Sequence, residues 1–242
     1  MQLLVEKQGK HFCPRVEGAS PLNPFSFAPR KSCIYYLNLR VFSMERFDNP
    51  DKFLHDAWHL LIKAAVKRKG DYQKPSVATV DADGFARQRV MVLREADLQR
   101  RMLTFFTDAR STKVEELRKH SYLSCLFWDE RKKVQIRMNG KAALEQGSER
   151  CRQYWDRLPV QGRSSYAALS APGTPQKTDK VPLPDHWHDG MDLQETAYAF
   201  EHFMVITCQV YNAGLLHLHH EGHQRAQFKY QDGAWAGKWV AP

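Results

Sequence analysis

The chain has 242 residues, enough for one ordinary domain with a tail or for two very small domains. Its 43% hydrophobic and 26% charged residues are typical of a soluble globular protein, and no apolar run approaches the ~20 residues of a membrane span. The formal net charge of +9 indicates an anionic partner, for which nucleic acid, an acidic membrane surface and a phosphorylated cofactor all qualify.

Residues 1–43 differ from the rest of the chain. They contain proline, serine and basic residues, only two acidic residues, and no sustained helical or strand period. The stretch lacks the apolar core of a signal peptide, and its prolines make a poor transit helix. We therefore expect a disordered tail or an over-extended reading frame over 1–43 and a folded domain over 44–242.

The first predicted element is a helix that Asp51 caps and Gly70 ends. Its apolar residues recur at helical spacing, which indicates one buried face. Two strands follow over 76–80 and 85–94, joined by a turn at 81–84.

Further strands are predicted over 103–107, 122–128 and 134–144, the last with alternating apolar and polar residues. Ser148 is expected to cap a helix, and the Ser-, Pro- and Gly-rich stretch 159–190 is typical of a long loop. The C-terminal part predicts strands over 203–211, 215–219, 225–230 and 235–240. Many short antiparallel strands with few helices indicate a mainly β protein, a barrel with flanking helices.

The segment 107–113 leads from a strand directly into a helix. Thr112 and Glu115 fit a capping box, so the helix should begin at Thr112. A helix start presents free N–H groups and a positive partial charge, and Ser111 and Lys113 add donors around it. This is a phosphate cradle in physical terms, although an ordinary solvated helix cap has the same pattern.

Two strands carry polar side chains suited to an anionic or ring-shaped ligand. Arg89 and Arg94 lie on the predicted strand 85–94, where their odd spacing sends them to opposite faces. One ligand could meet both along a bent strand or between subunits, and two cations at the ends of a buried strand are an equal alternative. Gln135 and Arg137 share one strand face, either as hydrogen-bonding partners of a cofactor ring or as the wet face of a sheet.

The sequence gives less support to metal binding, disulfide bonds or nucleic-acid binding. The histidines at 217, 219, 220 and 223 have no carboxylate or cysteine at metal-binding spacing, so we expect no metal site. The five cysteines are scattered and form no CxxC pair, which argues against disulfides and indicates a reducing cytoplasm. Basic and aromatic residues over 152–157 could contact nucleic acid, but their helical spacing makes them core residues first. We expect neither nucleic acid nor a membrane as partner.

Taken in order, these segments resemble the FMN-binding proteins related to pyridoxamine 5'-phosphate oxidase, from about Ser76 to Pro242. The carriers are RVMVLR at 89–94, FFTD at 105–108, RSTK at 110–113, VQIR at 134–137, GK at 140–141, HQR at 223–225, Trp235, and WVAP at 239–242. No single piece is specific, but their order and the characteristic terminus together identify the chain as a relative of this family.

The resemblance implies an FMN-binding split β-barrel with FMN between the two subunits of a homodimer. It implies that Arg89, Ser111 and Lys113 grip the phosphate, while Gln135 meets the ring and Arg225 closes over the cofactor. The implied cofactor-binding residues are Arg89, Val90, Met91, Val92, Leu93, Arg94, Phe106, Thr107, Ser111, Thr112, Lys113, Gln135 and Arg225. The implied substrate-binding residues are Arg94, Tyr154, Arg163 and His223, and no catalytic residue is assigned.

The departures from the family pattern concern mainly the substrate. Arg94 stands where the oxidase has a lysine that touches flavin and substrate, and Thr112 replaces an arginine beside the phosphate. The Arg-Leu-His triplet of the oxidase is Glu-Gly-His at 221–223 here, so the substrate arginine is missing. Tyr154 fits the substrate pattern, and Arg163 could compensate for an arginine that is displaced by one residue.

The sequence therefore predicts an FMN-dependent oxidoreductase, closer to the uncharacterised FMN-binding branch of the family than to the vitamin B6 oxidase. Hydride would pass from a small substrate, which could be phosphorylated, to the flavin. Three alternatives stay open: a flavin-binding or storage module without a dedicated substrate, a true pyridoxamine/pyridoxine 5'-phosphate oxidase, and a basic nucleic-acid-binding barrel.

Overall fold

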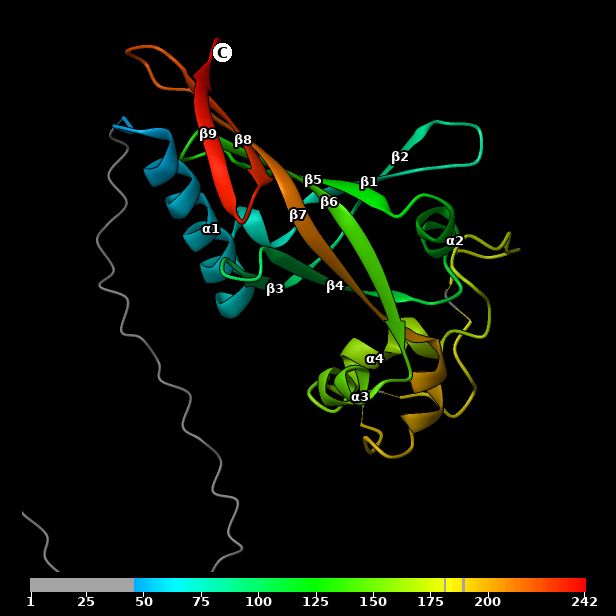
Figure 1. Ribbon diagram of the computed structural model, residues 1–242. Helices are drawn as coiled ribbons and strands as arrows, with labels where there is room; N and C mark the ends of the chain where they lie inside the picture. Colours follow the sequence, from blue (N-terminus) through cyan, green and yellow to red (C-terminus); the bar gives the residue numbers. More distant parts are fainter. Residues whose placement is uncertain (1–45, 181, 189) are drawn as a thin grey trace, which may run out of the picture. The chain divides into compact units, whose positions relative to one another are not determined.

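A computed structural model describes residues 46–180, 182–188 and 190–242, so the prediction for residues 1–43 lies outside the described residues. The elements, shown in Figure 1, are α1 (Pro50–Lys67), η1 (Asp71–Gln73), β1 (Ser76–Val80), β2 (Ala86–Val90), β3 (Leu93–Asp97), β4 (Met102–Asp108), α2 (Thr112–Lys119), β5 (Tyr122–Asp129), β6 (Val134–Gln146), α3 (Glu149–Trp155), α4 (Val160–Ala167), η2 (Ala197–His202), β7 (Phe203–His217), β8 (Gln224–Gln231) and β9 (Ala234–Val240). No helix among them is long and apolar enough to cross a membrane.

One antiparallel sheet of nine strands organises this part of the chain: seven follow the order β2-β1-β5-β6-β7-β4-β3, β8 pairs with β7, and β9 pairs with β8. The edge of β7 that faces away from β6 pairs with β4 over its first half and with β8 over its second half. The sheet therefore divides along β7, and its ends β2 and β3 do not pair to close it. The predicted class, mainly β with flanking helices, is confirmed.

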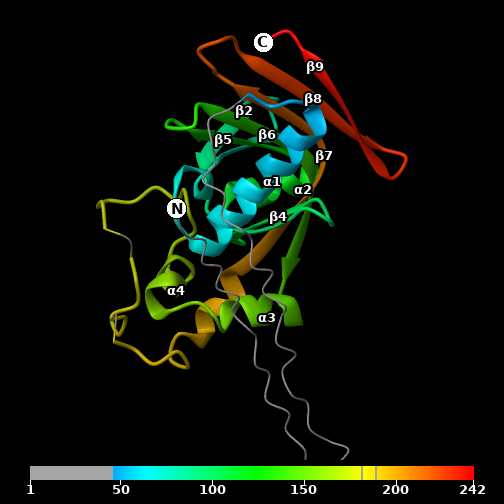
Figure 2. The ribbon, with the colours of Figure 1, turned by 90° about the vertical axis from the view of Figure 1, so that its left-hand side faces the viewer.

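The main core lies between α1 and the inner face of the sheet, the face that carries Val134, Ile136 and Met138. Figure 2 shows α1 lying across the sheet. Trp58 and Leu61 of this helix are fully buried, so removing either side chain should cost several kcal/mol. A second apolar cluster surrounds Trp155 of α3 and joins α4, η2 and the start of β7, at the far end of β6 and β7 in Figure 1.

The start of α1 differs from the prediction. Asn49, rather than Asp51, is the N-cap, and its Oδ1 accepts a hydrogen bond from the Lys52 N–H at 2.8 Å. Pro50 then occupies the first helical turn, where a missing N–H costs nothing. Asp51 instead places its negative charge in the first turn, where the helix dipole favours it.

The predicted single strand 85–94 is also wrong. The chain forms β2 and β3 with a break at Met91 and Val92, and the Met91 N–H donates to the Pro75 carbonyl at 3.0 Å. β2 pairs with β1 at one end of the sheet, whereas β3 pairs with β4 at the other end. The break lets the apolar segment 90–93 contribute to strands at both ends of the sheet. Met91 and Leu93 are buried there.

Two further boundaries differ downstream. The predicted loop 159–190 contains α4, and the two strands predicted over 203–219 form the continuous strand β7. The turn-like residues Asn212 and Gly214 pair with β6 on one side and β8 on the other. Pairing on both edges therefore overrides their low strand propensity.

Candidate functional site

Cationic and hydroxyl side chains gather where β4 passes into α2. The Lys113 ammonium donates to Thr107 Oγ1 at 3.1 Å and to Ser111 Oγ at 3.0 Å. Thr107 and Ser111 are buried, and the Ser111 hydroxyl donates to the Asp108 carbonyl at 2.8 Å. The helix begins at Thr112 as predicted, but its N-cap is Ser111 and no side chain caps it, so the predicted capping box is wrong.

Arg89 reaches the same region from β2. Its guanidinium donates to Glu116 Oε2 at 3.0 Å and to Thr79 Oγ1. Glu116 is thus paired with Arg89, and Asp108 is paired with Arg110 at 2.7 Å. Among the described residues, neither carboxylate is left as an ion-pair partner for Lys113.

The surroundings penalise the positive charge of Lys113. Desolvation lowers the pKa of Lys113 from its usual range, and the neighbouring Arg89 lowers it further. A bound dianion would reverse both effects, because it would accept hydrogen bonds from the ammonium and compensate its charge. The residues at the start of α2 therefore fit a phosphate group.

A cavity of about 270 Å³ opens where the end of α1, β3, β4 and the α3–α4 segment meet. The Arg94 guanidinium lies 5.2 Å from the centre of the Phe106 ring. The centres of the Phe106 and Tyr154 rings are 5.0 Å apart. Arg68 and Arg157 also line the cavity.

This cavity favours anions as well. Desolvation lowers the pKa of Arg94 from its usual range although part of the side chain still reaches solvent, and Arg68 adds a further lowering. The Tyr154 hydroxyl donates to Glu95, the acidic residue among those that line the cavity. Three arginines against one engaged carboxylate leave positive charge for a ligand to compensate.

Arg163, which the resemblance implies as a substrate-binding residue, is not among the residues that line this cavity. It is 3% exposed and donates to the carbonyls of Leu193 and Trp155 and to Thr196 Oγ1, at 2.7, 2.9 and 2.9 Å. Its guanidinium also stacks on the Trp155 ring at 4.6 Å. Arg163 therefore ties α4 to the segment before η2, and both of its terminal nitrogens donate within the protein.

Gln135 and Arg225 lie on the outer face of the sheet, the face of β5–β9 opposite the core. Gln135 pairs with Leu216, which pairs with Arg225, so the three form one row across β6, β7 and β8. Two strand spacings separate Gln135 from Arg225, ~10 Å. His223 is exposed in the turn that precedes β8.

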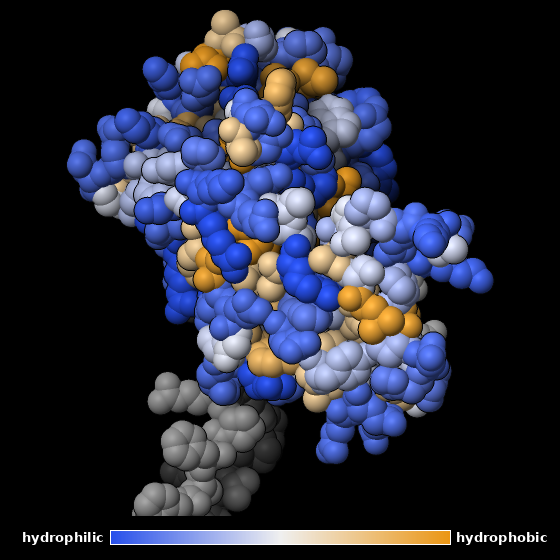
Figure 3. Space-filling view, turned by 90° about the vertical axis from the view of Figure 1, so that its right-hand side faces the viewer, coloured by the Kyte–Doolittle hydropathy of each residue, from blue (hydrophilic) through white to orange (hydrophobic). Residues whose placement is uncertain are grey.

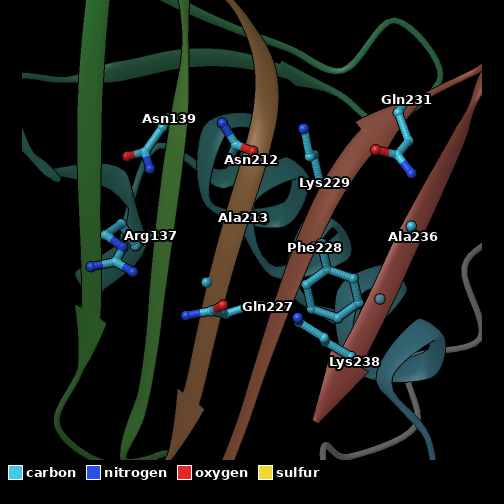
Figure 4. A pocket seen from close by; sticks show the side chains of 12 residues that line it. Arg137, Asn139, Asn212, Ala213, Gln227, Phe228, Lys229, Gln231, Ala236 and Lys238 are labelled. Carbon is cyan, nitrogen blue, oxygen red and sulfur yellow. The ribbon is translucent and has the colours of Figure 1, made fainter. Parts of the chain in front are cut away.

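Two residues along, Arg137 occupies the next row of this face beside Gly214. A Cβ at position 214 would lie 3.2 Å from Arg137 Nη2, so the glycine leaves room for the guanidinium across β7. Figure 4 shows Arg137 with the polar side chains of the adjacent strands, including Lys229 and Lys238, around a cavity of about 460 Å³.

Within one chain the predicted cofactor residues thus fall on two faces. Arg89 belongs to the inner-face row of Val77, Cys125 and Met138, whereas Gln135 and Arg225 leave the outer face. Of the apolar segment, Met91 and Leu93 are buried, Val92 is half-buried, and Val90 is exposed on the outer face. A single chain does not bring the two groups together.

Sequence reasoning missed several residues that shape this region. Glu116 lies one helical turn after Lys113, a spacing that could have indicated it. Thr79 and Arg68 offered no such signal, because their roles depend on contacts with β2 and with the cavity between distant elements.

Two solved structures share this fold. A pyridoxamine 5'-phosphate oxidase-related, FMN-binding protein from Nostoc punctiforme aligns with 81% of this chain and 100% of its own, with a TM-score of 0.59 and 17% identity. PhzG from Burkholderia lata, solved in complex with tetrahydrophenazine-1-carboxylic acid, aligns with 85% of this chain and 99% of its own, with a TM-score of 0.57 and 18% identity. The fold is the split β-barrel of FMN-binding proteins.

Sequence comparisons find similarity to a known domain and to whole relatives. Residues 55–146 match the FMN-binding domain of pyridoxamine 5'-phosphate oxidase. A pyridoxine/pyridoxamine 5'-phosphate oxidase from Thermosynechococcus vestitus is 30% identical over 127 residues, which are 46% of this chain and 59% of that relative. Its namesake from Caulobacter vibrioides is 24% identical over 197 residues, 75% of this chain and 81% of the relative. Over residues 55–146 the chain is therefore similar to the FMN-binding domain of pyridoxamine 5'-phosphate oxidase, and the cofactor of that domain is FMN.

Proposed function

We propose that this protein is an FMN-dependent oxidoreductase whose start of α2 holds the FMN phosphate. The observation that carries the proposal is the half-buried Lys113 ammonium, which faces two buried hydroxyls and has no carboxylate partner among the described residues. The buried Ser111 and Thr107 hydroxyls hold the ammonium in place, and Arg89 adds positive charge from β2. When bound, FMN supplies the hydride acceptor that the side chains of the protein lack.

The arginine-lined cavity is the proposed substrate site. Arg94 and Arg157 can hold a carboxylate or a phosphate, and Phe106 and Tyr154 supply an aromatic wall for a flat organic molecule. A volume of about 270 Å³ suits a small substrate. Tyr154 keeps its proton over the usual pH range, because desolvation and then Glu95 raise its pKa, so its hydroxyl can position a ligand.

We further propose a homodimer in which each FMN contacts both protomers. Gln135 and Arg225 leave the face opposite to Arg89, so one flavin could contact all three only if the first two came from the partner. The outer face also exposes apolar side chains: Val90 is 68%, Tyr122 66% and Leu126 40% exposed. Figure 3 shows hydrophobic patches on the side of the molecule that carries β2 and α2. Exposed patches of this kind are typical of interfaces.

A complementation experiment tests this arrangement. Lys113→Ala and Arg225→Ala chains each bind FMN weakly as homodimers, because every site has lost one contact. Refolding an equal mixture gives heterodimers in half of the molecules, each with one intact and one doubly altered site, so about a quarter of all sites should bind FMN tightly. Absence of any tight fraction would show that both residues serve the same chain's site or that the chains do not pair.

Oxidoreductase activity is separated from flavin storage by a second measurement. Under anaerobic conditions a substrate bleaches the flavin absorbance near 450 nm, roughly in proportion to hydride transferred. A panel of small amines and alcohols bearing a phosphate or a carboxylate should contain a compound that bleaches the wild type but not an Arg94→Ala variant. Failure of every compound, with the flavin fully bound, would favour the storage module.

A further inference from the structure

The turn between β7 and β8 carries four histidines within seven residues, His-Leu-His-His-Glu-Gly-His at 217–223. Each of His219, His220 and Glu221 offers one ligand atom, and these atoms all lie within 4.8 Å of one another. The sequence spacing alone argued against a metal because no carboxylate stood at a usual ligand spacing. The turn geometry instead brings Glu221 beside the two imidazoles.

The backbone holds these side chains in place. The Leu218 N–H donates to the Lys133 carbonyl at 2.9 Å, and the Gly222 N–H donates to the His219 carbonyl at 3.1 Å. From the start of the described chain, Arg46 Nη1 donates to the carbonyls of Glu221 and Gly222, at 3.2 and 2.7 Å. The turn is therefore fixed on both sides, and the two exposed ligands, His220 and Glu221, need only rotate about their side-chain bonds.

A second observation comes from His217 at the end of β7. This side chain is 1% exposed, and its Nδ1 has no hydrogen-bond partner among the described residues. Its ring centre lies 5.3 Å from that of His219. An unpaired buried nitrogen is costly unless it has a use.

We propose that His219, His220 and Glu221 form a binding site for a divalent transition-metal ion. A donor set of two imidazoles and one carboxylate binds Zn²⁺, Cu²⁺ and Ni²⁺ more tightly than Mg²⁺ or Ca²⁺. Metal–nitrogen bonds of about 2.0–2.1 Å require the ligand atoms to approach to roughly 3.3 Å, a shift that the exposed side chains can make. Water, or the neighbouring His217, completes the coordination.

The site also accounts for the acidic residue at position 221, where the resemblance to the oxidase leads one to expect an arginine. A carboxylate in this turn would repel an anionic substrate, but it lowers the energy of a bound cation. Because the same turn leads into Arg225, two residues after His223, a bound ion would stiffen the segment that precedes the proposed flavin contact.

Calorimetric titration of Zn²⁺ into the full-length, FMN-loaded protein tests the proposal. The double variant His219→Ala/His220→Ala should bind about 30-fold more weakly or worse, and Glu221→Gln about tenfold more weakly. The matched control is His55→Ala/His59→Ala, which removes another close histidine pair, with Nε2 atoms 3.0 Å apart on α1, and should leave the tight binding step unchanged. Mg²⁺ should give no binding heat.

Cobalt absorption gives an independent readout. Visible d–d bands of Co²⁺ should appear with the wild type and the α1 control, and disappear with His220→Ala, whose exposed position makes misfolding no concern. Unchanged Zn²⁺ affinity in the turn variants, or an equal loss in both double variants, would overturn the proposed site.

Discussion

Lys113→Ala is the most direct perturbation of the proposed phosphate site. The ammonium contacts two buried hydroxyls and has no carboxylate partner among the described residues, so its main energetic role is toward a bound anion. Losing one charged hydrogen bond to phosphate costs about 1.5–3 kcal/mol, which raises the Kd for FMN roughly 10- to 100-fold. Riboflavin lacks the phosphate and should bind the wild type and the variant almost equally poorly.

The same change should not weaken the apoprotein. Desolvation lowers the pKa of Lys113, which means that the empty site holds the charge at a cost. Lys113→Ala should therefore melt at or slightly above the wild-type temperature without FMN, and below it when FMN is saturating. Lys119→Ala, at the exposed last turn of the same helix, is the matched control and should leave both values unchanged.

Quenching of flavin fluorescence gives the two Kd values, and calorimetry gives the melting temperatures. A Lys113→Ala variant that holds FMN as tightly as the wild type would refute the phosphate assignment. A variant that loses riboflavin and FMN binding equally would show that Lys113 contacts the ring or maintains the fold instead.

Four other outcomes follow from the structure. FMN affinity should fall as pH rises, because the Lys113 ammonium binds phosphate only while it is protonated. The fall should begin at lower pH than for an ordinary lysine, since the pKa of Lys113 is lowered. FMN titrations at several pH values check this, and Lys113→Arg should remove the pH dependence. A chain that begins at Met44 should melt and bind FMN like the full chain, and a large drop in Tm would show that the earlier residues are structural. Arg163→Met should lower the free energy of unfolding by about 2–4 kcal/mol in urea, since it leaves buried acceptors unpaired, without changing the Kd for FMN. Turnover of pyridoxamine 5'-phosphate should be ~100-fold or more below that of a dedicated oxidase, because Glu221 repels the phosphate; Glu221→Arg should raise kcat/KM for hydrogen peroxide release, and full activity of the wild type would restore the vitamin B6 role.

Local patterns predicted much of the fold. The alternation of Val134, Ile136 and Met138 correctly gave the inner face of β6, because a strand has a period of two whatever it pairs with. Ser148 was correctly identified as a cap, since its hydroxyl accepts from the Cys151 N–H within the same turn. The break at Met91 could not be predicted in this way, because it depends on which end of the sheet each half joins.

The candidate site shows the same division. Ser111 and Lys113 could be identified because they are two residues apart at one helix start. The row of Gln135 and Arg225 depends on the register of three strands and spans 90 positions of sequence, so no local pattern reveals the face that they share. The sequence placed Arg163 in a loop as a cation that could bind substrate. Only the fold shows that its guanidinium donates to Thr196, 33 residues away.

The absorbance spectrum of the purified protein, followed by the mass of the compound that heat releases, tests the central claim most directly. We expect a yellow protein with flavin bands, one flavin for each chain, and a released mass equal to that of FMN rather than riboflavin or FAD. A colourless protein that retains no flavin after incubation with FMN and gel filtration would contradict it.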